Sequence, residues 1–308
     1  MRNGKTANAF WTGAIVVSLL LVLFSLFFVS CVGKSEAVPE PSPAKTETET
    51  PENEQPPEAQ TGTEQTGTEQ QPGGNQSTAE TPAAQTPDVT APAQRPPQDA
   101  TTLSETEDMG REYLDKFVFL GDSTTYGLGY YYSHGYTDLV PPEQIWTPAN
   151  GTLTLDQWNY VNIVYPQTGE ELKLTDLLEL TKPGYICITL GVNGVSFMSE
   201  DYFKESYSSL VKKIQEISPD TTIVLNSIYP VTVGYEAKNN GINNLKIEAA
   251  NLWVHDVAKA CGVHYLDSAS VLMNESRVLP DEYTNGDGLH LNGESFRLVI
   301  DYLRTHGC

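Results

Sequence analysis

The sequence predicts an α/β fold in which a mainly parallel sheet of five strands lies between two layers of helices. Short apolar runs alternate with segments whose apolar residues recur at helical spacing, which is typical of a parallel sheet covered on both faces. Polar residues follow the ends of several apolar runs, where ligands gather in such sheets. These elements all lie between residues 108 and 308, a length that is sufficient for one large core.

Five apolar runs are the expected strands, and four segments between or after them are the expected helices. The strands are predicted at residues 117–120, 162–165, 185–190, 222–225 and 263–266, and the helices at 173–180, 201–217, 243–260 and 292–306. Ser218-Pro219-Asp220 ends the second helix and Gly262 ends the third. The alternation of strand and helix therefore continues through the whole of this part.

A long insertion at residues 126–160 separates the first two expected strands. Asn150-Gly151 followed by Thr-Leu-Thr-Leu predicts a hairpin turn inside it. The insertion is rich in aromatic residues, namely Tyr126, Tyr130, Tyr131, Tyr132, Tyr136, Trp146, Trp158 and Tyr160. Most are expected to form a small core of the insertion, while one or two could border a binding site.

Two segments of different composition precede the predicted domain. Residues 1–34 contain an almost purely apolar run after Arg2 and Lys5, long enough to span a bilayer. This leader is expected to be either an uncleaved signal anchor or a lipoprotein signal peptide, because Phe28-Val-Ser-Cys31 resembles a lipobox; simple secretion is a further alternative. Residues 35–107 are rich in Pro, Thr, Glu and Gln and predict a disordered linker. All three alternatives place the domain, residues 108–308, outside the cell. A retained or lipidated leader would also hold the domain at the membrane surface.

Charge and cysteine content exclude several classes of function. The net charge of -22 makes nucleic acid an improbable partner for an exported domain. Four cysteines give no disulfide framework, although Cys261 and Cys308 could pair. No Cys-x-x-Cys or His-x-x-x-His spacing indicates a metal site.

Three short motifs carry the candidate chemistry. Ser123 follows the first strand in Gly121-Asp122-Ser123, and Asp287 and His290 lie three residues apart near the end of the chain. A serine, a histidine and an aspartate can act as nucleophile, base and orienter of the base. Together with Gly191-Val192-Asn193, these motifs resemble, in order, the first, third and fifth blocks of the SGNH/GDSL hydrolases. The resemblance covers about residues 116–306.

The resemblance implies a three-layer α/β/α fold with a flavodoxin-like sheet and an acyl-ester hydrolase that needs no metal or organic cofactor. Ser123 would be the nucleophile, with His290 as base and Asp287 as its partner. The oxyanion would be bound by the Ser123 N–H, the Asn193 amide and Gly169, the glycine that best matches the second block by position. Gly194 stands where the family usually has aspartate, so the third block is incomplete.

The expected function is that of a surface-tethered esterase acting on an acylated carbohydrate or another small ester, with acetyl the expected acyl group. Asp122, Tyr126 and Tyr229 are expected to border the substrate. An acyltransferase that uses the same acyl-serine remains an alternative, and so does a non-catalytic glycan-binding domain on a hydrolase fold. The leader predicts association with the membrane. The sequence contains no indication of the oligomeric state.

Overall fold

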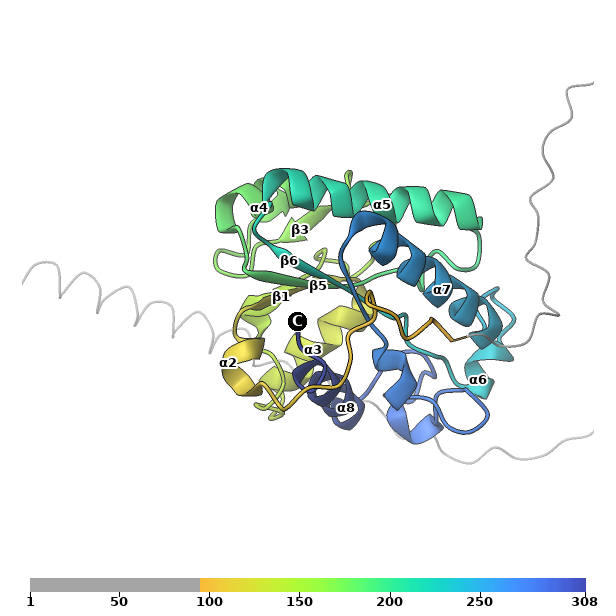
Figure 1. The fold of residues 1–308 in the computed structure, drawn as a ribbon. Coiled ribbons are helices and arrows are strands. Elements are labelled where there is room, and N and C mark those ends of the chain that lie inside the picture. Colours follow the sequence, from red (N-terminus) through yellow and green to blue (C-terminus); the bar gives the residue numbers. More distant parts are fainter. Residues whose placement is uncertain (1–94) are drawn as a thin grey trace, which may run out of the picture. The chain divides into compact units, whose positions relative to one another are not determined.

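A computed structural model describes residues 95–308, and its centre is a parallel sheet of five strands. The strand order is β2-β1-β5-β6-β7 (Figure 1). The bounds are Phe117–Gly121 for β1, Ile145–Trp146 for β2, Tyr185–Thr189 for β5, Thr222–Asn226 for β6 and His264–Leu266 for β7. All four neighbouring pairs are parallel, which confirms the predicted α/β class.

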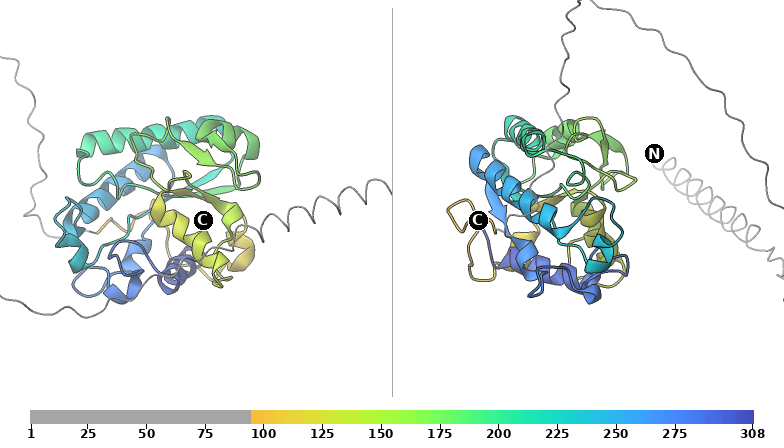
Figure 2. Two further views of the ribbon diagram at one scale, coloured as in Figure 1. Left: turned by 180° about the vertical axis from the view of Figure 1, so that it is seen from behind. Right: turned by 90° about the vertical axis from the view of Figure 1, so that its right-hand side faces the viewer.

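Helices cover both faces of the sheet. The helices are α2 (Gly110–Leu114), α3 (Ser123–Ser133), α4 (Leu174–Thr181), α5 (Glu200–Ile217), α6 (Val233–Glu236), α7 (Asn244–Cys261) and α8 (Gly293–Arg304). Helices α4, α5 and α7 lie on one side of the sheet, and α2, α3 and α8 on the other (Figures 1 and 2). Short 3₁₀ turns occur at Pro142–Gln144, Ser268–Val271 and Asp281–Tyr283. The three-layer architecture is therefore the predicted one.

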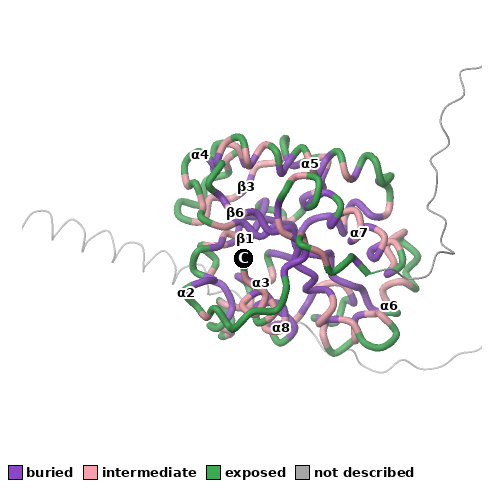
Figure 3. Tube along the Cα trace, viewed as in Figure 1, coloured by how far each residue is buried: buried purple, intermediate pink, exposed green. Residues whose placement is uncertain are grey.

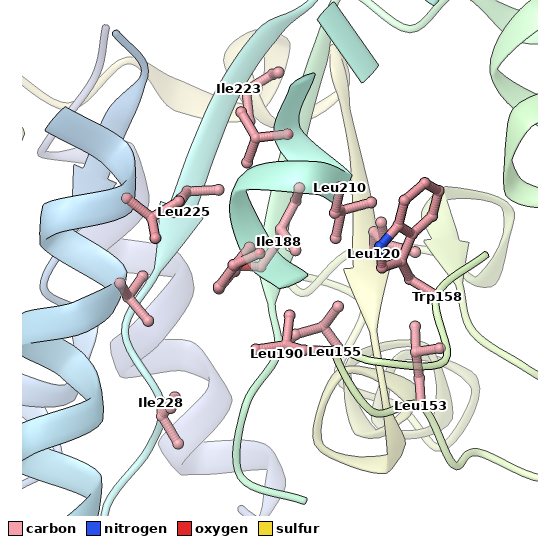
Figure 4. Packing of buried hydrophobic residues seen from close by; sticks show 14 of the residues in the cluster. Leu120, Leu153, Leu155, Trp158, Ile188, Leu190, Leu210, Ile223, Leu225 and Ile228 are labelled. Atoms are coloured by element: carbon pink, nitrogen blue, oxygen red, sulfur yellow. The ribbon is translucent and has the colours of Figure 1, made fainter. Parts of the chain in front are cut away.

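The alternation of side chains along the central strands divides the core into two clusters. On β5, Ile186 and Ile188 join the cluster beneath α4, α5 and α7, whereas Cys187 joins the cluster beneath α2, α3 and α8. Figure 4 shows part of the first cluster, including Leu225 and Leu210. The strands are buried on both faces (Figure 3), which explains why they read as continuous apolar runs. The sheet is thus a rigid platform for the loops that leave its carboxyl edge.

The prediction for the second strand was wrong. Residues 162–165 do not enter the main sheet: β3 (Asn162–Val164) pairs antiparallel with β4 (Glu171–Lys173) in a separate two-stranded sheet. The fifth position of the main sheet is occupied by β2, which pairs with β1 through only two residue pairs. A two-residue strand is too short to show an apolar period, so the pattern indicated the longer apolar run instead.

The insertion also differs from its prediction. It begins with α3, in which Gly and Tyr residues alternate without a clear apolar face, so no helical period marks it. Asn150-Gly151 forms a turn, but no strands flank it. Trp146 and Trp158 are buried in the main core, whereas Tyr126 and Tyr160 are more than half exposed. The aromatic residues therefore do not form a separate core.

Residues 97–107 pack on the domain, so a boundary at residue 108 is too late. Thr102 forms a parallel bridge with Tyr265 at the edge of β7, and Leu103 is buried. Asp99 forms an ion pair with Lys259 and contacts His255 on α7. These contacts are long-range in sequence, and composition alone does not reveal them. The predictions for the leader and for residues 35–94 lie outside the described residues.

Within residues 95–308, none of the helices has the length and apolar character needed to cross a membrane. Cys187, Cys261 and Cys308 are free thiols, so the alternative in which Cys261 and Cys308 pair is not the one observed.

Candidate active site

Ser123 lies at the junction of β1 and α3, on the carboxyl edge of the sheet. Asp122 caps the helix, because its Oδ1 accepts the backbone N–H of Thr124 at 2.9 Å. The preceding residue must be glycine: a Cβ at Gly121 would lie 1.9 Å from Thr125 Oγ1 and 2.6 Å from the Thr189 carbonyl oxygen. The turn therefore brings the helix directly against the sheet and places Ser123 at its first turn, where backbone N–H groups lack intrahelical acceptors.

Ser123 and His290 are 167 residues apart in sequence but share a hydrogen bond. The Oγ of Ser123 and the Nε2 of His290 are 2.8 Å apart, and the Nδ1 of His290 is 2.6 Å from Asp287 Oδ2. The Nδ1–H donates to the carboxylate, which leaves Nε2 as the acceptor of the serine hydroxyl proton. The structure thus brings together the three residues that the sequence nominated as nucleophile, base and orienter.

The loop that carries Asp287 and His290 holds the Asp287 carboxylate by hydrogen bonds within the loop. Asp287 Oδ1 accepts the backbone N–H groups of Leu289 and His290, each at 2.8 Å, while Oδ2 accepts the N–H of the His290 imidazole. Partial burial alone would raise the pKa of Asp287, but these hydrogen bonds outweigh it and lower the pKa below its ordinary value. The carboxylate therefore stays ionised and can stabilise an imidazolium.

Asn193 follows β5, and its amide contacts Asp122, the residue that precedes Ser123. One N–H of its amide donates to Asp122 Oδ2 at 2.9 Å, and its other contact is a long one of 3.4 Å to the Leu153 carbonyl oxygen. The N–H that Asp122 does not hold is the one left as a donor to a charged oxygen. Gly194 stands in place of the family's aspartate, and a Cβ there would lie 2.6 Å from Met198 Sδ, so a larger residue would require the Met198 side chain to shift.

Asp122, which the sequence suggested as a substrate contact, lines a small cavity next to the nucleophile. The residue is fully buried, and its carboxylate accepts hydrogen bonds from the Thr124 backbone N–H, the Thr124 hydroxyl and Asn193. Burial raises the pKa of Asp122 to about 6, so the carboxylate is largely ionised at neutral pH. Its observed contacts hold the helix start and Asn193 in place.

The glycine predicted to lie in the oxyanion site belongs to the connecting turn of the separate two-stranded sheet. Gly169 lies in the turn between β3 and β4, where its N–H donates to the Tyr165 carbonyl oxygen. Gly151 lies beside the nucleophile instead, since a Cβ there would be 3.6 Å from Ser123 Cβ. The sequence predicted a hairpin turn at Gly151. The position of this glycine after a strand, Ile145–Trp146, could have identified it, but a two-residue strand leaves no apolar pattern. The N–H of Gly151 donates to the Pro148 carbonyl oxygen.

The other two expected substrate contacts differ from each other. Tyr126 lies one turn after Ser123 on α3 and is 55% exposed, so its ring is available at the surface. Tyr229 is 5% exposed, but it lines a cavity that also reaches Thr124 and Leu289. Among residues 95–308, no group of three or more His, Cys, Asp or Glu side chains is arranged to hold a metal ion.

Solved structures from several bacteria are similar to this chain at low identity. A GDSL-like lipase from Bacteroides thetaiotaomicron is 18% identical, with a TM-score of 0.42, and the match covers 63% of this chain and 88% of that one. The periplasmic domain of a lipopolysaccharide acetyltransferase from Salmonella Paratyphi A is 18% identical over 61% and 81% of the two chains, with a TM-score of 0.43. A mutant of an acetyl-xylooligosaccharide esterase from Geobacillus is 16% identical over 62% and 94%, with a TM-score of 0.38.

No curated protein sequence matches the chain. Residues 119–298, more than half of the chain, match the GDSL-like lipase/acylhydrolase family, which supports an ester hydrolase. The match begins within β1 and ends within α8, so it contains Ser123, Asn193, Asp287 and His290. The chain therefore belongs to the GDSL-like lipase/acylhydrolase family.

Proposed function

We propose that this protein is a serine esterase that removes acetyl or another short acyl group from carbohydrate by a Ser-His-Asp mechanism. The observation that carries the proposal is the continuous hydrogen-bonded chain from Ser123 through His290 to Asp287, with distances of 2.8 and 2.6 Å. This arrangement fits covalent acyl transfer, because the hydroxyl has a base within reach and the base has a fixed partner.

In this mechanism Ser123 Oγ bonds to the ester carbonyl carbon while its proton passes to His290 Nε2. When the tetrahedral intermediate collapses, the bond from carbon to the leaving alcohol breaks, and the imidazolium returns its proton to that alcohol. Water, activated by the same imidazole, then attacks the acyl-serine and releases the acid. Asp287 stabilises the imidazolium in both halves of the reaction and does not itself take the proton.

The developing oxyanion would be bound by the Ser123 backbone N–H and the Asn193 amide. The Asn193 N–H that contacts Leu153 at 3.4 Å is the available donor, because the other is held by Asp122. Gly151 borders this position closely and leaves room for the substrate oxygen, although its own N–H is bonded within the turn. One such side-chain donor is worth about 3 kcal/mol of barrier.

The carbohydrate part of the proposal rests on location and on the exposed aromatic ring near the nucleophile. An apolar leader after Arg2 and Lys5 favours export, so the accessible esters would be those of extracellular or cell-wall glycans. Tyr126 offers a ring on which a sugar can stack, one turn from Ser123.

The direct test is acetate release from acetylated glycans by the purified full-length protein. We expect acetate to accumulate in proportion to enzyme and time, with the deacetylated glycan as the second product. A parallel assay with p-nitrophenyl acetate separates the two parts of the proposal. Hydrolysis of the chromogenic ester without acetate release from any acetylated glycan would contradict the carbohydrate assignment and leave the esterase assignment in place.

Asp122→Asn is expected to lower kcat by roughly 10- to 100-fold with little change in KM. The substituted amide can accept only through its oxygen, so it cannot receive all the donors that now converge on Asp122, and Asn193 loses its fixed orientation. Steady-state kinetics on p-nitrophenyl acetate measure the effect, and the exposed Asp220→Asn is the matched control.

Two further readouts identify the cause. In an Asn193→Ala background, Asp122→Asn should cause no additional loss of kcat, because its effect passes through Asn193. Additive losses of kcat would contradict the positioning role.

The pKa of Asp122 in the folded protein, about 6, lies above the ordinary value of 3.8, so the unfolded chain loses this proton first as pH rises. The wild type should therefore lose unfolding free energy, on the order of 3 kcal/mol, relative to the variant between pH 4 and pH 7.

A further inference from the structure

A small cavity opens between the loops that follow β5 and β6. Its walls come from the ends of those strands, from the start of α3 and from the loop that carries His290. The lining residues are Asp122, Thr124, Thr189, Leu190, Gly191, Val192, Ile228, Tyr229 and Leu289. Most of the exposed lining is apolar, so the cavity suits a small apolar group.

Several residues that line the cavity are chain neighbours of Ser123, His290 and Asn193. Asp122 and Thr124 are the sequence neighbours of Ser123, and Leu289 directly precedes His290. Gly191 and Val192 lead into Asn193, whose amide donates to Asp122, another lining residue. A carbonyl group bonded to Ser123, with its oxygen near Asn193, would therefore have its acyl chain beside this cavity.

The wall formed by Ile228 is close and rigid. A Cβ at Gly191 would lie 2.6 Å from Ile228 Cδ1, so this side chain already packs directly on the backbone of the opposite loop. Asn251 on α7 holds the Ile228 backbone by accepting its N–H at 2.7 Å and donating to its carbonyl oxygen at 3.0 Å. Ile228 is 2% exposed, so this wall has no solvent into which it can move.

Leu289 forms a lip of the cavity and is only half-buried. Its backbone N–H donates to Asp287 Oδ1 at 2.8 Å, which holds the backbone next to His290 in place. The space between these walls admits about one group of the size of a water molecule or a methyl. A longer acyl chain would have to displace Leu289 or Ile228.

We propose that this cavity is the acyl site and that Ile228 and Leu289 restrict the acyl group to acetyl. The inference rests on the proposed esterase function and adds the residues that select the substrate. An acetyl methyl fills the cavity, whereas the two extra carbons of a butyryl chain meet the Ile228 wall and the Leu289 lip. Each carbon that a pocket cannot accommodate typically changes kcat/KM by about 10- to 200-fold.

The test compares p-nitrophenyl acetate and p-nitrophenyl butyrate, which share a leaving group, as substrates of the full-length protein. For the wild type we expect kcat/KM to be at least about 10-fold higher with acetate. Leu289→Ala should raise kcat/KM for butyrate and reduce the acetate preference by about 10-fold. Leu180→Ala is the matched control, because Leu180 is 61% exposed on α4 and does not line the cavity.

Ile228→Val removes one methyl from the other wall and is expected to shift the preference in the same direction by a smaller factor. This conservative change keeps the fold and the backbone hydrogen bonds to Asn251. An acetate preference that neither variant alters, or a wild type that hydrolyses both esters equally, would overturn the acyl-site assignment while leaving the esterase function standing. Hydrolysis of neither ester by the wild type would overturn both.

Discussion

Ser123→Ala is expected to reduce ester hydrolysis by about 10⁴-fold or more, because alanine has no atom that can form the acyl-enzyme. Ser123 Oγ is the hydroxyl that His290 Nε2 contacts at 2.8 Å, so the variant lacks the proton that the imidazole takes. The measurement is hydrolysis of p-nitrophenyl acetate under pre-steady-state conditions. The wild type should release a burst of p-nitrophenol equal to the enzyme concentration, and the variant should release none.

Ser209→Ala on α5 is the matched control, since Ser209 is exposed on the face of a helix that covers the sheet. It should keep the wild-type burst and turnover. Unchanged hydrolysis by Ser123→Ala, with a wild-type melting temperature, would exclude the acyl-serine mechanism.

Asp287→Asn is expected to lower kcat by roughly 10³- to 10⁴-fold while the domain remains folded. The amide oxygen can replace Oδ1 as acceptor of the Leu289 and His290 N–H groups, which turns the amide nitrogen toward His290 Nδ1. The imidazole must then accept at Nδ1 and carry its proton on Nε2. In that tautomer it cannot take the proton of Ser123.

Steady-state kinetics at neutral pH check this prediction, with Asp281→Asn as the control for loss of an exposed carboxylate in the same region. Loss of kcat with nearly constant KM is expected, because the substrate does not touch Asp287 before reaction. A variant that keeps kcat within 10-fold of the wild type would show that His290 is oriented by another group.

Elements with a strong local pattern were predictable from sequence. The helix at residues 201–217 has an N-cap serine, Ser199, and apolar residues at helical spacing, and it appears as α5 with almost the same bounds. The strand β5 was also predictable, because it is buried and its residues form a continuous apolar run. By contrast, β2 contributes two residues, and α3 presents no apolar face, so neither left a periodic signal.

The sequence by itself determined the α/β class and the presence of a serine, an aspartate and a histidine in ordered motifs, because apolar period and residue type are local properties. Only the tertiary structure decided that Gly151 rather than Gly169 lies beside Ser123, and that Asp122 is buried against Asn193. These relations join residues from loops that meet only when parallel strands align at one edge of the sheet. The distances between these residues in the folded protein are set by strand order and packing. The spacing of the residues along the chain does not encode those distances.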